Sequence, residues 1–240
     1  MTIGFIVECA PLGPDEVLVR EVMRRFRPDD EPKTVVLARN NKGILLANAV
    51  KDTASLIKQG CAKVFILWDW HPIEVNWGET RNEWRPGMCR KEAAKLRKDL
   101  VAAGVNIKKV VLVCVTQEVE AWALADKTAI KAQVTDRLKT HQPRHIHVPK
   151  TPWPEEEPDP ERRLENIFKK NEVALVKHQD VPAIFRYAAT SCFKKWDTCP
   201  AFTRFVDRLL GTEDGFDDAV ADCERRAAAR QPHVERGRQR

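Results

Sequence analysis

The sequence predicts an α/β protein with an open, mainly parallel sheet flanked by helices and followed by a C-terminal helical lobe. Three observations predict it. Short apolar runs alternate with amphipathic helical patterns in the first half of the chain. The runs are near-continuous, as in strands that are covered on both faces. A proline-rich stretch then separates this alternating part from a remainder with helical patterns alone.

Four short segments have the composition of buried strands. Residues 3–7, 64–68 and 110–115 are near-continuous apolar runs, and residues 34–38 form a weaker candidate between the first two. Because helical patterns lie between them, right-handed crossovers and parallel strands are expected.

The segments between these strands show helical periodicity. Within residues 14–26, Val19, Val22, Met23 and Phe26 fall on one helix face at i, i+3, i+4 and i+7. A less complete repeat begins near Leu46 and stops at Gly60. A third helix is predicted over residues 86–103, with Gly104 as its stop.

The pattern changes after residue 125. Residues 141–161 contain six of the fifteen prolines, which excludes a helix interior or a central strand and predicts a linker or an extended surface arm. Four helices are predicted beyond it, at 161–170, 181–190, 201–210 and 215–230. The expected organisation is an α/β core (1–135), a Pro-rich arm (136–160), a helical lobe (161–223) and a basic tail (224–240).

Composition bounds the function without identifying it. The 240 residues suit one domain, or one domain with an appended lobe. Of the formal net charge of +6, residues 224–240 carry +4, so the body is nearly balanced. A solvated terminal tail explains this excess more readily than a phosphate-binding tail. No apolar stretch approaches the length of a membrane span, and the N-terminus lacks the features of a secretory signal.

The seven cysteines are scattered and form no C-x-x-C pair. Their odd number and irregular spacing argue against a disulfide framework and against a structural zinc site. We therefore expect free thiols and a cytoplasmic location.

Acidic residues follow the predicted strands at one edge of the sheet. The first strand ends at Glu8, the third ends at Asp69 with His71 two residues on, and the fourth leads into Glu118 and Glu120. Ligands of open parallel sheets bind at the carboxyl ends of the strands. Converging carboxylates repel one another unless a cation neutralises them, and hard divalent ions prefer oxygen ligands. The pattern indicates Mg²⁺ or Mn²⁺, although N-caps and solvated loop residues are the simpler reading of each position alone.

These residues also resemble a known family. A strand ending in Glu, a later strand ending in Asp-x-Asp and a parallel α/β scaffold are features of the Toprim domain of topoisomerases, DnaG-type primases and overcoming-lysogenization-defect (OLD) nucleases. The segments at 4–8, 64–69 and 118–126 are more closely similar to a small stand-alone Toprim-like family described as a domain of unknown function. The resemblance extends over residues 3–211, through Asp159-Pro160, Lys177 and the segment 199–205.

The resemblance implies a Toprim/Rossmann-like fold and a role for each matching residue. Glu8 would be the general acid or base, or a metal ligand, in phosphodiester chemistry, and Asp69 would hold the metal. Residues two apart on a helix point in different directions, so Glu120, which matches the family's Glu-Ala-Trp, is preferred to Glu118 as the further ligand. Lys177 would stabilise developing charge on phosphate.

Two departures from the family pattern bear on activity. Cys9 stands where a glycine usually follows the first Glu, and His71 replaces the second Asp of Asp-x-Asp. An imidazole is a poor ligand for Mg²⁺ but can bind Mn²⁺. His71 is therefore expected to shift the metal preference, to weaken binding or to mark a loss of activity.

The resemblance implies two functions from different classes, of which the residues themselves indicate only a divalent-metal phosphate site. The first is a metal-dependent nuclease, a hydrolase acting as effector beside an AAA- or ABC-type ATPase of the OLD kind in antiviral defence, with DNA or tRNA as substrate. The second is a catalytically inactive Toprim-like module that binds an ATPase or nucleic acid.

Some other side chains invite a functional interpretation. Arg39 and Lys42, after the second strand, are candidate phosphate contacts, and loop chemistry is the simpler explanation of both. Trp122 is expected in the core, with base stacking as the alternative. Asp126 is expected to support the site from behind its ligands or to be solvated. The histidines at 141, 145 and 147 are expected on a surface arm, and among the tryptophans at 68, 70, 77 and 84 the first is expected to be buried and the last two exposed.

Overall fold

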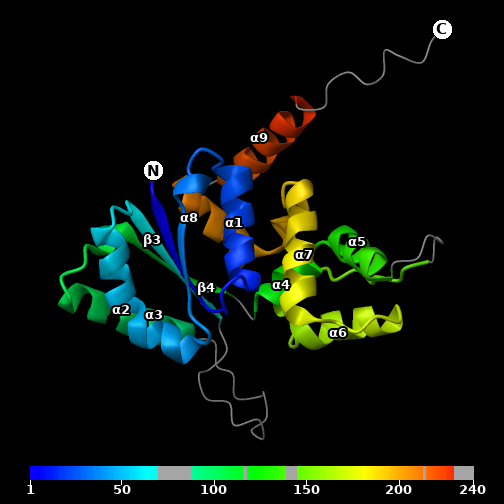
Figure 1. Ribbon diagram of the computed structural model, residues 1–240, viewed down its shortest axis with the longest axis horizontal. Helices are drawn as coiled ribbons and strands as arrows, with labels where there is room; N and C mark the ends of the chain where they lie inside the picture. Colours follow the sequence, from blue (N-terminus) through cyan, green and yellow to red (C-terminus); the bar gives the residue numbers. More distant parts are fainter. Residues whose placement is uncertain (70–87, 116–117, 139–144, 213–214, 230–240) are drawn as a thin grey trace, which may run out of the picture.

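The computed structural model describes residues 1–69, 88–115, 118–138, 145–212 and 215–229. In these residues the chain forms a four-stranded, all-parallel sheet with helices on both faces, which confirms the predicted fold class (Figure 1). The strands and helices follow the order β1 (Ile3–Val7), α1 (Pro14–Phe26), η1 (Glu31–Lys33), β2 (Val35–Ala38), α2 (Lys42–Lys58), β3 (Lys63–Asp69), α3 (Met88–Ala102), η3 (Ile107–Lys109), β4 (Val110–Val115), α4 (Val119–Leu124), α5 (Lys127–Leu138), η4 (Pro154–Glu156), α6 (Pro160–Lys170), α7 (Lys177–Thr190), η5 (Lys194–Thr198), α8 (Pro200–Leu210) and α9 (Gly215–Ala229).

The strand order is β2-β1-β3-β4. Because all neighbours are parallel, Val7 lies beside Leu67 and the ends of β1 and β3 meet at the same edge. The predicted strands agree with these bounds to within one residue. The predicted helices agree less well, since α7 begins at Lys177 and not at residue 181, and α5 was not predicted.

Alternate side chains of the strands enter two separate hydrophobic clusters. Phe5 and Phe65 pack with α1 and with the helices that follow β4, whereas Ile6 and Ile66 pack beneath α2 and α3. Figure 1 shows α2 and α3 on one side of the sheet and α1 and α7 on the other. The C-terminal helices therefore provide much of the second covering layer of the sheet. The domain boundaries at 135, 160 and 223 stay predictions.

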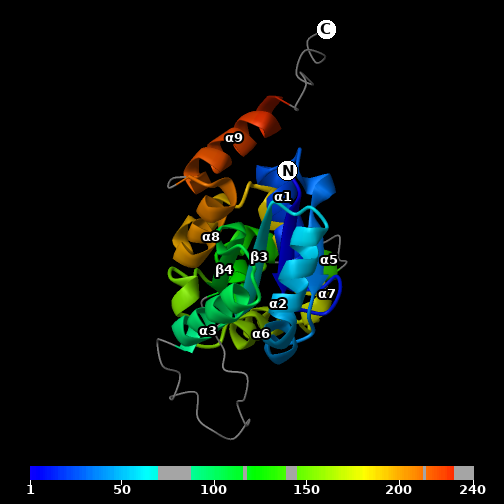
Figure 2. The same cartoon turned by 90° about the vertical axis from the view of Figure 1, so that its left-hand side faces the viewer.

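The expectation that the cysteines are free thiols was wrong for several of them. Cys192, just after α7, forms a disulfide with Cys223 in α9, and Cys114 is also disulfide-bonded, whereas Cys9, Cys61 and Cys199 are free and buried. Figure 2 shows α9 extending beyond the rest of the molecule. The sequence misled because pairing depends on which side chains the fold brings together, and spacing does not report this.

The proline-rich segment lies on the surface where it is described. Residues 145–153 form no regular element, and His145 and His147 are exposed. The Asn171 side chain accepts a hydrogen bond from the His147 N–H and donates one to its carbonyl, each 2.9 Å long. His141 lies outside the described residues. No helix in the described part of the chain is long and apolar enough to cross a membrane.

Candidate functional site

Carboxylates from three connections meet at the carboxyl edge of the sheet. Glu8 follows β1 and Asp69 ends β3, and the Asp69 N–H donates a 3.1 Å hydrogen bond to Glu8 Oε2. Glu118 is the N-cap residue of α4, and Glu120 lies in the first turn of that helix, where it is 1% exposed. The structure thus brings together the four acidic residues that the sequence placed at this edge.

A fifth carboxylate, Asp15, was not predicted. It lies in the first turn of α1 and is 4% exposed. Gly13 precedes this helix in a tight turn, where an added Cβ would lie 2.7 Å from the Ala10 carbonyl oxygen. The signal available in the sequence was the position of the β1–α1 connection, which leaves the sheet at the same edge as Glu8.

We call the carboxyl edge of the sheet with Glu8, Asp15, Asp69, Glu118 and Glu120 the acidic edge. Its surroundings disfavour the ionised form of a buried carboxylate. Burial raises the pKa of Asp15 well above its usual value, and the charges of Glu120 and Glu8 raise it further. Burial likewise raises the pKa of Asp69, with added repulsion from Asp15 and Glu8. Burial also raises the pKa of Glu120, although Lys177 opposes this. These shifts indicate that the cluster carries more negative charge than its surroundings balance.

Lys177 provides a cation at this edge from the start of α7. Its Nζ lies 2.9 Å from Glu120 Oε1 and 2.9 Å from Glu161 Oε2. Partial burial alone would lower the pKa of Lys177, but Glu120 and Glu161 outweigh that effect and the pKa is raised. Lys177 therefore stays charged beside the carboxylates.

A buried carboxylate holds the start of α7 in place. Asp180 is 0% exposed, and its Oδ2 accepts a 2.6 Å hydrogen bond from the Val176 N–H while its Oδ1 accepts a 2.7 Å bond from Gln133 Nε2. Because Val176 immediately precedes Lys177, these bonds determine where the lysine enters the site.

The donor chemistry of this edge fits a hard divalent cation. Asp15 Oδ1 and Asp69 Oδ1 are buried and accept no hydrogen bond within the described part of the chain. Carboxylate oxygens are the ligands that Mg²⁺ and Mn²⁺ prefer. In the described residues, however, no three His, Cys, Asp or Glu side chains are arranged so as to hold an ion. His71, the predicted imidazole ligand, lies outside the described residues, as do Trp70, Trp77 and Trp84.

The two predicted phosphate contacts lie in internal ion pairs. Arg39 donates hydrogen bonds of 2.8 and 2.7 Å to the two carboxylate oxygens of Asp52. Lys42 is 4% exposed, and its Nζ lies 2.8 Å from Glu92 Oε1. These partners hold α2 and count against the prediction that the two cations contact nucleic acid.

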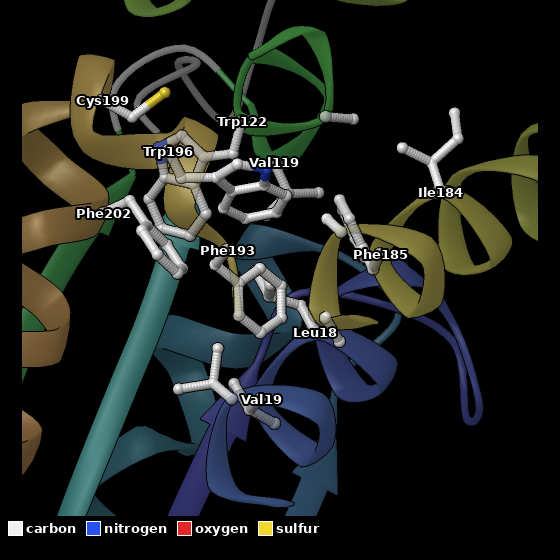
Figure 3. Packing of buried hydrophobic residues seen from close by; sticks show 14 of the residues in the cluster. Leu18, Val19, Val119, Trp122, Ile184, Phe185, Phe193, Trp196, Cys199 and Phe202 are labelled. Atoms are coloured by element: carbon white, nitrogen blue, oxygen red, sulfur yellow. The ribbon is translucent and has the colours of Figure 1, made fainter. Parts of the chain in front are cut away.

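The aromatic expectations are confirmed where they are described. Trp68 is fully buried, and so is Trp122, which packs edge-on against Phe202 and close to Trp196 (Figure 3). Base stacking by Trp122 is therefore excluded.

Two further residues near the end of a strand or helix have local roles that the structure shows. Asp126 is neither solvated nor part of the acidic cluster, because its Oδ1 accepts hydrogen bonds from the N–H groups of Thr128 and Ala129 and so caps α5. Cys9 lies close to the cluster, but burial together with the charge of Asp15 raises its pKa to about 12. The thiol is therefore protonated at neutral pH and does not serve as a nucleophile.

Comparison with known proteins identifies a family. A family model described as a domain of unknown function (DUF4276) matches residues 15–210. The chain belongs to this family. Neither the curated proteins nor the solved structures contain a match.

Proposed function

We propose that this protein is a divalent-metal-dependent, phosphodiester-cleaving enzyme: a nuclease of the Toprim type. One observation carries the proposal. Glu8, Asp15, Asp69 and Glu120 converge at the carboxyl edge of a parallel sheet, where their mutual repulsion and burial call for a cation. Lys177 compensates part of this charge, and it is already shared with Glu161.

Each residue has a role in this proposal. Two of the carboxylates among Glu8, Asp15, Asp69 and Glu120, together with water and phosphate oxygens, would hold Mg²⁺ or Mn²⁺. The bound ion would polarise a phosphoryl oxygen and lower the pKa of a bound water. The Asp69 N–H orients the Glu8 carboxylate, which is then positioned to accept or donate a proton. Lys177 keeps a positive charge available for the negative charge that develops on phosphate.

The biological setting of the proposal comes from the resemblance to Toprim proteins. It comprises an AAA- or ABC-type ATPase partner and a role in antiviral defence. DNA and tRNA are both retained as substrates, because the acidic edge recognises a phosphodiester whichever sugar carries it.

Cleavage assays test the proposal at Asp69. We expect purified protein to cut plasmid, single-stranded DNA or tRNA with Mn²⁺ or Mg²⁺, and not in EDTA, in the presence of the ATPase partner if needed. Asp69→Asn should lower the rate by about 100-fold or more. The matched control is Asp99→Asn, which changes an exposed carboxylate on α3 and should leave the rate unchanged.

A metal-binding measurement gives a second readout. Mn²⁺ should raise the melting temperature of the wild-type protein and of Asp99→Asn, but not that of Asp69→Asn, because the ion binds the folded state alone. Equal cleavage by Asp69→Asn and the wild type would contradict the assignment of this edge.

The second candidate is a catalytically inactive module that binds an ATPase or nucleic acid. It is favoured by the lack, among the described residues, of three side chains arranged for a metal ion, and by His71 in place of an acidic ligand. Protein that binds its ATPase partner, shows no shift in melting temperature with Mn²⁺ and cuts none of the three substrates would establish this candidate over the enzyme.

A further inference from the structure

A cavity of about 680 Å³ lies at the C-terminal end of α4, away from the acidic cluster at its N-terminal end. Its walls come from four separate parts of the chain: Leu124 of α4, Lys127 of α5, the surface arm with Lys150 and Trp153, and Lys195 of η5. None of these residues belongs to the acidic edge. The cavity is therefore a separate feature of the molecule.

The walls of this cavity are positively charged. Lys127, Lys150 and Lys195 are exposed, and within the described residues none of them forms an ion pair. The two carboxylates in the wall are Asp126 and Asp197, and Asp126 already caps α5. An anion that enters the cavity therefore meets three lysines with no competing internal partner.

Trp153 stands at the rim with an exposed indole. Its exposed fraction is 62%, whereas Trp68, Trp122 and Trp196 are fully buried. Trp153 immediately precedes η4, which is anchored in the core, because Glu155 accepts a 2.7 Å hydrogen bond from Trp122 Nε1 and a 3.0 Å bond from the Ala201 N–H. A large apolar ring is thus presented to solvent from a well-anchored turn, as in stacking platforms for nucleobases.

The cavity continues into a second cavity, so that together they offer more room than a single nucleotide needs. A second cavity of about 430 Å³ shares the wall residues Asp126, Thr128, Lys194 and Lys195 with the first. At the other end, α4 has six residues and is about 9 Å long. The cavity and the acidic edge therefore lie at the two ends of one short, buried helix.

We propose that this lysine-lined cavity binds single-stranded nucleic acid, with a base stacked on Trp153 and phosphates held by Lys127, Lys150 and Lys195. Stacking on one exposed indole requires an unpaired base, which favours single strands over duplex. The proposal rests on the proposed function for what happens to the strand at the acidic edge. The binding itself does not depend on it.

Binding is tested with a fluorescently labelled 20-nucleotide oligo-dT and the full-length protein in EDTA, by fluorescence anisotropy. Trp153→Ala should weaken binding about tenfold or more, and Trp153→Phe should retain most of it. Lys127→Glu combined with Lys195→Glu should weaken binding further. It should also reduce the slope of log K against log salt concentration by an amount equivalent to about two phosphate contacts. Far-ultraviolet circular dichroism checks that each variant is folded.

The matched control is Lys58→Glu, which changes an exposed lysine of α2 on the opposite face of the sheet. Loss of affinity in this control equal to that in the cavity variants would show nonspecific charge attraction and overturn the proposal. Unchanged affinity in Trp153→Ala, or preference for duplex DNA over oligo-dT, would overturn it as well. Because EDTA removes metal from the assay, a failure to bind is distinct from a failure to cleave.

Discussion

Two groups of buried or partly buried carboxylates in this molecule differ in how they are compensated. In the first group, Asp52 accepts hydrogen bonds from Nε and Nη2 of Arg39. Glu92 forms an ion pair with Lys42 and accepts a 3.0 Å hydrogen bond from Trp68 Nε1. In the second group, Asp15 and Asp69 each keep a buried oxygen that accepts no hydrogen bond from the described residues.

The difference in pairing separates carboxylates that contribute to stability from carboxylates that reduce it. Buried carboxylates are costly unless they are paired, and the first group is paired. The second group gathers like charges at the sheet edge, so its pKa values rise. Strain of this kind persists at functional sites and is offset by the stability of the rest of the fold.

The largest expected effect comes from breaking a compensated pair. Lys42→Met should lower the free energy of unfolding by about 3 kcal/mol, because it leaves Glu92 without its cation in a largely buried position. Urea denaturation measures the loss. Lys42→Met combined with Glu92→Gln should recover part of it, and a single variant as stable as the wild type would show that the pair is not needed.

Neutralising a carboxylate of the acidic edge should change the free energy of unfolding in the opposite direction and raise it. In EDTA at pH 7, Asp69→Asn should raise the free energy of unfolding, because the neutral amide avoids the burial and the repulsion that raise the pKa of Asp69. The folded state of the wild type binds more protons than the unfolded state between the ordinary and the raised pKa, so stability falls as pH rises through that interval. Thermal unfolding across this pH range should show that the melting temperature falls less steeply with rising pH in the variant than in the wild type. An asparagine variant less stable than the wild type in EDTA at pH 7 would contradict the repulsion.

A smaller effect is expected at Asp126, a carboxylate of the compensated kind. Asp126→Ala removes the N-cap of α5 and should lower the free energy of unfolding by about 1 kcal/mol. Urea denaturation again provides the measurement, with the exposed Asp99→Ala as control. Stabilisation by Asp126→Ala would place this residue with the acidic edge and not with the compensated group.

The sequence by itself determined the sheet and the convergence of the first carboxylates. Continuous apolar runs such as residues 3–7 form buried parallel strands because both of their faces are covered. Once the strands are parallel, Glu8 and Asp69 must lie at the same edge, since each follows the carboxyl end of its strand. Both deductions need only local composition and one rule of topology.

Tertiary structure alone decided which charges meet and which aromatic rings are exposed. The sequence does not show that Lys177 reaches Glu120, that Lys42 is buried against Glu92, or that Trp153 faces solvent. Each of these contacts depends on how segments distant along the chain pack against one another. Local composition restricts the backbone of a segment, but the direction and the partner of a side chain are set by the neighbours that the whole fold supplies.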